Sequence, residues 1–404
     1  MEARWHTRGI EGLQEREENL GAALAGPVPG YGATAVGMLA FGYLAGLAVL
    51  NGWIQGRSGL STSLFGLVLA TGAVAALLVN VYLRRTGRRF SGELGLLLLS
   101  FAVWLPVLAQ SLPALLLAYS LQGAASRIAL AGLYRAIAEV QRRGMLMGST
   151  RNTTLTLESM AGFGLAASFF LNSQITERLG AGWPSALIAM LVGVVSAWVL
   201  GGKLPDWQGA ETARSEGEGR MHPALLFAFA IYCTEVFTMT QATAWGSILT
   251  GELRFGSRVL PPLMAGGLMT GVFWLVVGCA RWLAGQRTGI ELRRVVVGGL
   301  VFCIAAVIGV MLSGSRGTPL LLSYAAMGAG IACFVPFALQ TIAQEKNAGR
   351  LADRFALLGP VMSVGVHLVT GTLSAYREWF VLAALTASLL LALRGHKNTP
   401  LARP

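Results

Sequence analysis

The sequence predicts an all-α integral membrane protein, with twelve transmembrane helices arranged as two pseudo-symmetric six-helix bundles. Three observations lead to this fold class. Of the 404 residues, 54% are hydrophobic and only 12% are charged, and the mean hydropathy is +0.61, whereas soluble domains carry about 25% charged residues. The hydrophobic residues form runs long enough to cross a bilayer, and the basic residues gather in alternate connections. Soluble enzymes, disulfide-rich secreted proteins and disordered chains are therefore excluded.

Twelve runs have the length of a spanning helix, which needs about 20 mostly apolar residues. Strands of a transmembrane barrel are excluded, because they take about 10 residues with strict alternation. The predicted spans are 31–55, 62–83, 92–110, 113–138, 148–172, 183–202, 223–249, 259–281, 295–313, 318–343, 353–375 and 378–394.

The connections between the spans predict the orientation of the chain. The N-terminal segment, every second connection and the C-terminal tail carry 23 of the 31 Lys and Arg residues, and the other connections carry 6. Because basic residues collect in cytoplasmic connections, we expect both termini in the cytoplasm and the protein in a bacterial inner or plasma membrane. The same rule explains the net charge of +12 without a nucleic-acid partner.

The chain divides into two halves. The predicted units are a cytoplasmic segment at 1–30, a six-helix bundle at 31–202, a polar cytoplasmic linker at 203–222, a second six-helix bundle at 223–394 and a cytoplasmic tail at 395–404. An internal repeat is indicated because Tyr119, Gly123, Ala138 and Gly144 recur 205 residues later as Tyr324, Gly328, Ala343 and Gly349. Repeated halves are typical of secondary transporters, whose solute site lies between them.

The connection after the second span carries a basic motif, NVYLRRTGRR, from Asn80 to Arg89. It resembles the signature G-x-L-x-D-R-x-G-R-R of the major facilitator superfamily at Arg85, Gly87, Arg88 and Arg89. The resemblance implies twelve helices in two halves, with a gate at their cytoplasmic ends. In the family an Asp of this motif joins the charge network of the gate, and Arg84 stands in its place here, where Arg cannot take its part.

A second feature of the family, an Arg- and Gly-rich turn after the fourth span, is matched by EVQRRG from Glu139 to Gly144. Arg135 and Glu139 are one helical turn apart and are predicted to form a local pair. The candidate gating residues are thus Arg84, Arg85, Gly87, Arg88, Arg89, Arg135 and Glu139. Topology anchors would have the same composition, so both interpretations stay open at this point.

Three ionisable residues are expected at membrane depth, where a charge costs about 2.5–3.5 kcal/mol. Arg127 and Glu158 each lie about 21 Å from the outer end of their predicted spans, so an ion pair between them is expected. Glu235 lies midway along the seventh span without an evident partner in its half. In the functional interpretation Arg127 attracts the solute, and Glu158 or Glu235 carries a proton because burial favours the neutral carboxyl group. In the structural interpretation Arg127 and Glu158 only neutralise each other.

Polar residues within other spans complete the predicted solute and proton pathway. His367 can relay protons or serve as a packing residue, and the amide side chains can line a cavity or join helices. These residues are Asn51, Gln55, Gln241, Gln340 and His367. No metal or cofactor is expected, because the cysteines lack CxxC spacing and no phosphate-binding loop is present.

These features favour a monomeric secondary active transporter that moves a small organic solute, anionic or zwitterionic, by proton-coupled alternating access. An enzyme is not expected, because the polar groups are dispersed and form no catalytic set. Two alternatives keep the fold without transport. One is a membrane assembly factor or pigment-handling scaffold, and the other is a sensor that binds a solute without moving it.

Overall fold

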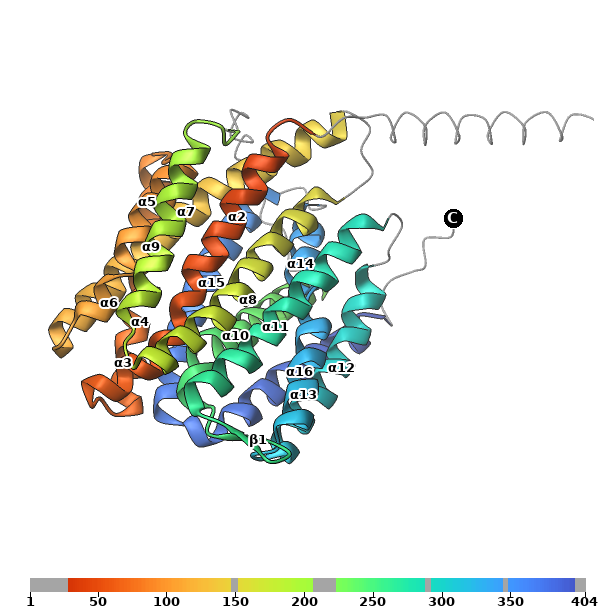
Figure 1. The fold of residues 1–404 in the computed structure, drawn as a ribbon. Coiled ribbons are helices and arrows are strands. Elements are labelled where there is room, and N and C mark those ends of the chain that lie inside the picture. Colours follow the sequence, from red (N-terminus) through yellow and green to blue (C-terminus); the bar gives the residue numbers. More distant parts are fainter. Residues whose placement is uncertain (1–27, 147–151, 206–222, 288–291, 344–347, 397–404) are drawn as a thin grey trace, which may run out of the picture.

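The computed structural model describes residues 28–146, 152–205, 223–287, 292–343 and 348–396. Within these ranges the chain forms a bundle of helices with one short β-hairpin at one end (Figure 1). In the described part of the chain, ten helical segments are long and apolar enough to cross a membrane, and the shorter apolar helices Gly92–Leu108 and Leu357–Thr372 correspond to the two remaining predicted spans. The prediction of an all-α membrane protein is confirmed.

The first six spans are α2 with η1 and α3 (Tyr31–Ala45, Gly46–Leu50, Asn51–Ser58), α4 (Thr62–Thr86), α5 with α6 (Gly92–Ala102, Leu105–Leu108), α7 (Leu112–Leu146), α8 (Thr153–Leu179) and α9 (Trp183–Leu200). The last six are α10 (Pro223–Leu249), α11 (Pro262–Gln286), α12 (Leu292–Ser313), α13 with α14 (Gly317–Ile331, Phe334–Ala343), α15 (Ala348–Thr372), and η2 with α16 (Ser374–Tyr376, Arg377–His396).

Four helix ends differ from the prediction and change where two charged residues lie. Helix α7 continues to Leu146 instead of ending at 138, and α11 continues to Gln286 instead of ending at 281. Helix α8 begins at Thr153 and ends at Leu179, whereas 148–172 was predicted. As a result, Arg281 lies inside a helix, and Glu158 lies close to the start of one.

Short polar residues and glycines set the ends of several helices. The side chains of Ser61, Ser91 and Asn152 accept hydrogen bonds from backbone N–H groups in the first turns of α4, α5 and α8, which satisfies donors that a helix start leaves open. Helix α4 is followed by Gly87, whose φ of +63° is a left-handed conformation that favours glycine. The reversal before α5 therefore requires this glycine.

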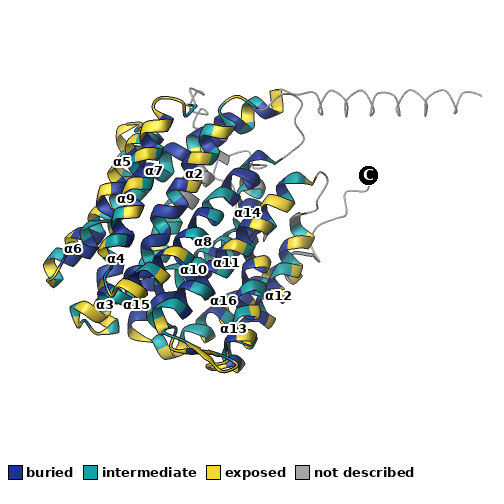
Figure 2. Ribbon diagram, in the orientation of Figure 1, coloured by how far each residue is buried: buried dark blue, intermediate teal, exposed yellow. Residues whose placement is uncertain are grey.

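The outside of the bundle is apolar. Large hydrophobic side chains such as Trp198 (81% exposed) and Leu312 (80%) point outward, and exposed residues follow the outer helices and the hairpin in Figure 2. An exposed apolar surface of this extent suits contact with lipid tails rather than water.

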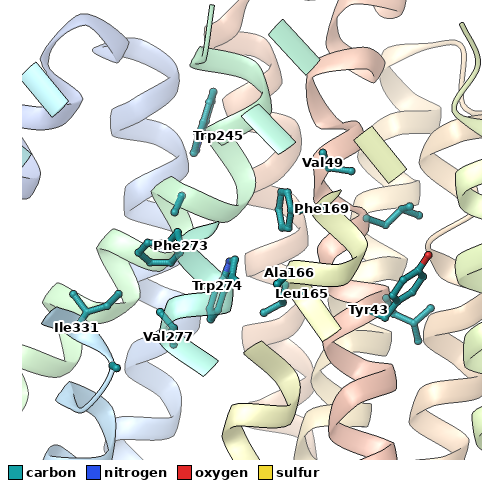
Figure 3. Close-up of a cluster of buried hydrophobic side chains, with 14 of the residues drawn as sticks. Tyr43, Val49, Leu165, Ala166, Phe169, Trp245, Phe273, Trp274, Val277 and Ile331 are labelled. Atoms are coloured by element: carbon teal, nitrogen blue, oxygen red, sulfur yellow. The ribbon is translucent and has the colours of Figure 1, made fainter. Parts of the chain in front are cut away.

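Helices α8 and α11 belong to different halves of the sequence, yet they pack along each other through small residues. A Cβ on Gly162 would lie 3.1 Å from Cα of Gly278, and a Cβ on Gly285 would lie 2.6 Å from Cγ2 of Thr156. We call this interface the α8–α11 seam. Further along it, Trp274 of α11 lies beside Leu165 and Ala166 of α8 (Figure 3). The absence of side chains at these glycines allows the two backbones to approach closely.

Further contacts between the halves lie near the hairpin. The Asn51 amide donates to the Ala244 carbonyl (3.0 Å), the Gly52 N–H donates to the Ser247 hydroxyl (3.2 Å), and the Ser63 hydroxyl donates to the carbonyl of Gly371 (3.0 Å). We call this end of the bundle the hairpin end. The opposite end, where α4 and α7 finish with Arg84, Arg85, Arg142 and Arg143, is called the basic end.

Two residues of the predicted repeat have matching surroundings. A Cβ on Gly123 would overlap the carbonyl of Gly72 in α4, the second span, and a Cβ on Gly328 would overlap the carbonyl of Phe273 in α11, the eighth. Because the second span corresponds to the eighth after a shift of six, these glycines serve the same close approach in both halves.

The hairpin is an element that the sequence analysis did not predict. Strands β1 (Leu253–Phe255) and β2 (Arg258–Leu260) pair antiparallel with Leu253 opposite Leu260. The turn contains Gly256 at φ +61°, and Phe255 packs over Gly317 at the start of α13.

Candidate functional site

Three charged side chains meet in the interior, one from each of α8, α10 and α11. Glu158 and Glu235 are 2% and 0% exposed, and Arg281 is 8% exposed. The Nη2 of Arg281 lies 2.5 Å from Oε1 of Glu235, and its Nη1 lies 3.5 Å from Oε2 of Glu158. We call Glu158, Glu235 and Arg281 the charge cluster. It joins the two halves, because Glu158 belongs to 31–202 and the other two residues to 223–394.

The charge cluster also forms hydrogen bonds with the backbone where the helix breaks between α13 and α14. Helix α13 ends at Ile331 and α14 starts at Phe334, so carbonyl and N–H groups near the break lack helical partners. The Nε of Arg281 donates to the carbonyl of Ala332 (2.9 Å), and the N–H of Val335 donates to Oε2 of Glu235. A cation thus meets the negative end of one helix and a carboxylate the positive end of the next, as helix dipoles favour.

The carboxylate of Glu158 accepts fewer hydrogen bonds than that of Glu235. Its Oε1 accepts a hydrogen bond from the hydroxyl of Tyr134 on α7 (3.1 Å). Its Oε2 is buried without a hydrogen-bond partner, and the 3.5 Å to Arg281 is longer than a charge-assisted hydrogen bond.

This arrangement corrects two sequence expectations. Arg281, the last residue of a predicted span, was not selected as a site residue, and Glu235 was expected to lack a partner in its half, but Arg281 is that partner. The expected Arg127–Glu158 pair is not formed, since Glu158 contacts Tyr134 and Arg281 instead. The reason is depth: Tyr134 is seven residues beyond Arg127 on α7, which is about 10 Å along a helix.

Arg127 lies nearer the middle of the bundle. Its Nη2 donates to Oδ1 of Asn80 on α4 (2.8 Å), and its Nε is buried without a hydrogen-bond partner. Tyr232 of α10 and Arg84 of α4 interact with it electrostatically, so Arg127 faces the second half of the chain. Among the described residues, no carboxylate forms an ion pair with Arg127.

Most of the other predicted pathway residues lie toward the hairpin end. Asn51 accepts from the hydroxyl of Tyr119 (2.7 Å) as well as donating to Ala244. The amide of Gln55 lies 3.3 Å from the carbonyl of Leu60. They therefore do not gather around the charge cluster.

His367 and Gln241 are also held by neighbours. The Nδ1 of buried His367 accepts from Nε1 of Trp245 (3.2 Å). The amide of Gln241 donates to Thr370, and its Oε1 is buried without a partner beside a cavity of about 50 Å³ between α10, α12, α13 and α16. Gln340 lies in α14, and its side chain is outside the described part of the structure.

The candidate gating residues are at the basic end. The predicted Arg135–Glu139 pair is absent: Glu139 accepts from Arg142 (2.7 and 2.8 Å) and Arg143 (2.8 Å), and Arg135 donates to the carbonyl of Phe90. Arg85, Arg88 and Arg89 are exposed, whereas Arg84 is half-buried. Arg135 thus connects α7 to the connection before α5 rather than to its own helix.

Several residues of this site were not selected from the sequence: Arg281, Tyr134, Tyr232 and Asn80. The sequence does indicate that Arg281 lies inside a helix, because the apolar run continues beyond it through Trp282 and Leu283. The two tyrosines carried no such signal, since buried tyrosines are common in helices of any function. Among the described residues, no group of three or more His, Cys, Asp or Glu side chains could hold a metal ion.

No model of a known protein family matches the sequence, and no curated protein matches it. Solved structures do match over almost the whole chain. The xylose transporter XylE from E. coli, in an inward-open conformation, is 12% identical with a TM-score of 0.66, and the match covers 92% of this chain and 96% of that one. A variant of the peptide transporter POT in complex with alafosfalin is 13% identical with a TM-score of 0.61, covering 94% and 97%.

Proposed function

We propose that this chain, which has the major facilitator fold, is a secondary active transporter that carries a small organic solute across the membrane by alternating access. The halves 31–202 and 223–394 are the units that move relative to each other, and the chain acts as a monomer. The basic end and both termini lie in the cytoplasm, in a bacterial inner or plasma membrane. The distribution of 23 basic residues against 6 supports this orientation.

The observation that carries the proposal is the buried ion pair between Glu158 and Arg281, which joins the two halves. Charges inside a membrane protein are costly and are typically functional. Alternating access requires contacts between the halves that break and re-form. An ion pair that one proton can cancel meets this requirement, so we assign proton coupling to Glu158 or Glu235.

The second element of the proposal is the chemistry of the solute. Arg127 faces the second half and has a hydrogen bond to Asn80 but no carboxylate partner among the described residues. A guanidinium group binds carboxylates and phosphates in a fixed geometry. We therefore assign an anionic or zwitterionic solute, with Arg127 as the group that binds its negative charge.

The test is uptake and efflux of labelled carboxylates, phosphates and amino acids by proteoliposomes with an imposed pH gradient. We expect the gradient to drive accumulation of at least one anionic or zwitterionic solute. Arg127→Gln should abolish this accumulation, whereas Arg178→Gln, a change at an exposed residue of α8, should leave it intact.

The alternatives give different results in the same assay. A sensor would bind one of the solutes without moving it. An assembly factor or pigment-handling scaffold would neither bind nor move any of them. Either result would contradict the proposed function.

A further inference from the structure

We propose that Glu158 is the residue that binds the coupling proton, at its Oε2 atom. Glu235 and Arg281 stay ionised and keep their hydrogen bonds to the backbone at the break between α13 and α14. This inference rests on the proposed function, because it names the proton site of the carrier.

Glu235 is unsuited to bind the proton because both of its oxygens already accept hydrogen bonds. Arg281 donates to Oε1 at 2.5 Å, and the N–H of Val335 donates to Oε2. Donors on both oxygens favour the ionised form of a carboxyl group. A proton on Glu235 would displace one of these donors and loosen the break between α13 and α14.

Glu158 has a vacant position for a proton. Its Oε1 accepts one neutral hydrogen bond from Tyr134, and its buried Oε2 has none. A buried acceptor that lacks a donor is destabilising, and more so if it is charged. A proton at Oε2 removes the charge from the one carboxylate oxygen of the cluster that receives no hydrogen bond.

The net charge of the cluster also favours Glu158 as the site of the proton. Two carboxylates and one guanidinium leave an excess of one negative charge, so a single proton makes the cluster neutral. If Glu158 takes the proton, Arg281 keeps its 2.5 Å bond to Glu235 and is not left as an uncompensated buried cation. Protonation of Glu235 would break this shorter bond and keep the longer contact of 3.5 Å.

The titratable and charged groups that interact electrostatically with Glu158 come from α7, α10, α11 and the break after α13. They are Tyr134 of α7, Arg281 of α11, Tyr232 and Glu235 of α10, and Cys333 at the break after α13. The hydroxyl and thiol groups stay neutral near neutral pH. The charge on Glu158 is therefore balanced by Arg281, which Glu235 also shares.

Protonation of Glu158 changes the attraction between the halves. Glu158 lies five residues into α8 and Arg281 five residues before the end of α11, so both are about one and a half turns from the basic end. Loss of the charge on Glu158 removes the electrostatic bond of the α8–α11 seam at this end. Proton binding is thereby coupled to separation of the two helices.

The test is infrared difference spectroscopy of the reconstituted protein between about pH 6 and alkaline pH, a range in which exposed carboxyl groups stay ionised. The method detects the C=O stretch of protonated carboxyl groups. We expect a carboxyl band that titrates in the unmodified protein and in Glu235→Gln, and that is lost in Glu158→Gln. The matched control is Glu177→Gln, a change at an exposed residue of the same helix, which should keep the band. A band that is lost in Glu235→Gln and persists in Glu158→Gln would overturn the inference.

Tyr134→Phe provides a second and milder variant. Loss of the hydroxyl donor destabilises ionised Glu158, so the band should persist to a pH about one unit higher, equivalent to one hydrogen bond to a charged group. An unchanged midpoint would contradict the assignment to Glu158. If no carboxyl band titrates in the unmodified protein, proton coupling itself fails, which is distinguishable from a wrong choice between the two glutamates.

Discussion

Arg281 makes the contacts on which the interior depends. It bonds Glu235, faces Glu158 and caps the carbonyl of Ala332, so one side chain connects α8, α10, α11 and the break after α13. A buried ion pair contributes little when both charges are replaced by apolar groups, but removal of one partner leaves an uncompensated charge.

Arg281→Met should therefore reduce the free energy of unfolding by about 3–5 kcal/mol. The double variant Arg281→Met with Glu235→Gln should recover part of this loss, because one of the two stranded carboxylates becomes neutral. Thermal unfolding of the detergent-solubilised protein measures both effects. Arg287→Met, at the exposed end of the same helix, is the control and should change stability little. Equal losses in Arg281→Met and Arg287→Met would show that the cluster does not stabilise the fold.

Between elements, the α8–α11 seam requires glycine at particular positions. A Cβ on Gly278 would lie 2.8 Å from the ring of Phe163 and 3.2 Å from the carbonyl of Ser159. By contrast, a Cβ on Gly298, in α12, would meet nothing within 4 Å. The two positions share the residue type but not the packing.

Gly278→Leu should lower stability by about 1–3 kcal/mol, the usual effect of overpacking, or separate the two helices. Gly298→Leu should be neutral or slightly stabilising, because leucine has the higher helix propensity. The measurement is the unfolding midpoint of each variant in detergent. A Gly278→Leu protein as stable as Gly298→Leu would mean that the seam is looser than the structure describes.

For the molecule as a whole, the contacts between halves are divided between two ends. Hydrogen bonds from Asn51, Gly52 and Ser63 close the hairpin end, and the Glu158–Arg281 pair lies toward the basic end. In alternating access the contacts of the hairpin end must open when the solute faces that side.

Gly52→Leu tests this movement. A side chain at Gly52 would collide with the carbonyl group of Ser247, whereas one at exposed Gly56, a turn later in α3, would meet nothing within 4 Å. Since overpacking costs about 1–3 kcal/mol, the equilibrium should shift roughly 5- to 150-fold toward the state that is open at the hairpin end.

The shift can be measured by the rate at which an impermeant maleimide labels Ala244→Cys in a background without the native cysteines. Labelling should be faster in Gly52→Leu than in Gly56→Leu, and transport should be lost only in the former. Identical labelling rates would contradict opening at this end.

Part of the candidate site could be predicted from the sequence, as four of its residues show. Glu158 and Glu235 were selected because an acidic residue inside an apolar run stands out even when the exact ends of the helix are not known. Arg281 was missed because the predicted span stopped at that residue, and the real helix continues to Gln286. Arg127 was paired with the wrong residue because the depth of Glu158 was counted from residue 172, whereas α8 continues to Leu179.

The membrane class, the succession of apolar helices and the fold followed from the sequence alone, because the length and apolarity of a spanning helix are local properties that the bilayer imposes on every segment. The partner of each buried charge was decided only by tertiary structure, because pairing depends on the rotation, depth and neighbours of several helices at once. The sequence therefore determined which charges the membrane must accommodate, and the packing of α8 against α11 determined that Glu158 meets Arg281 rather than Arg127.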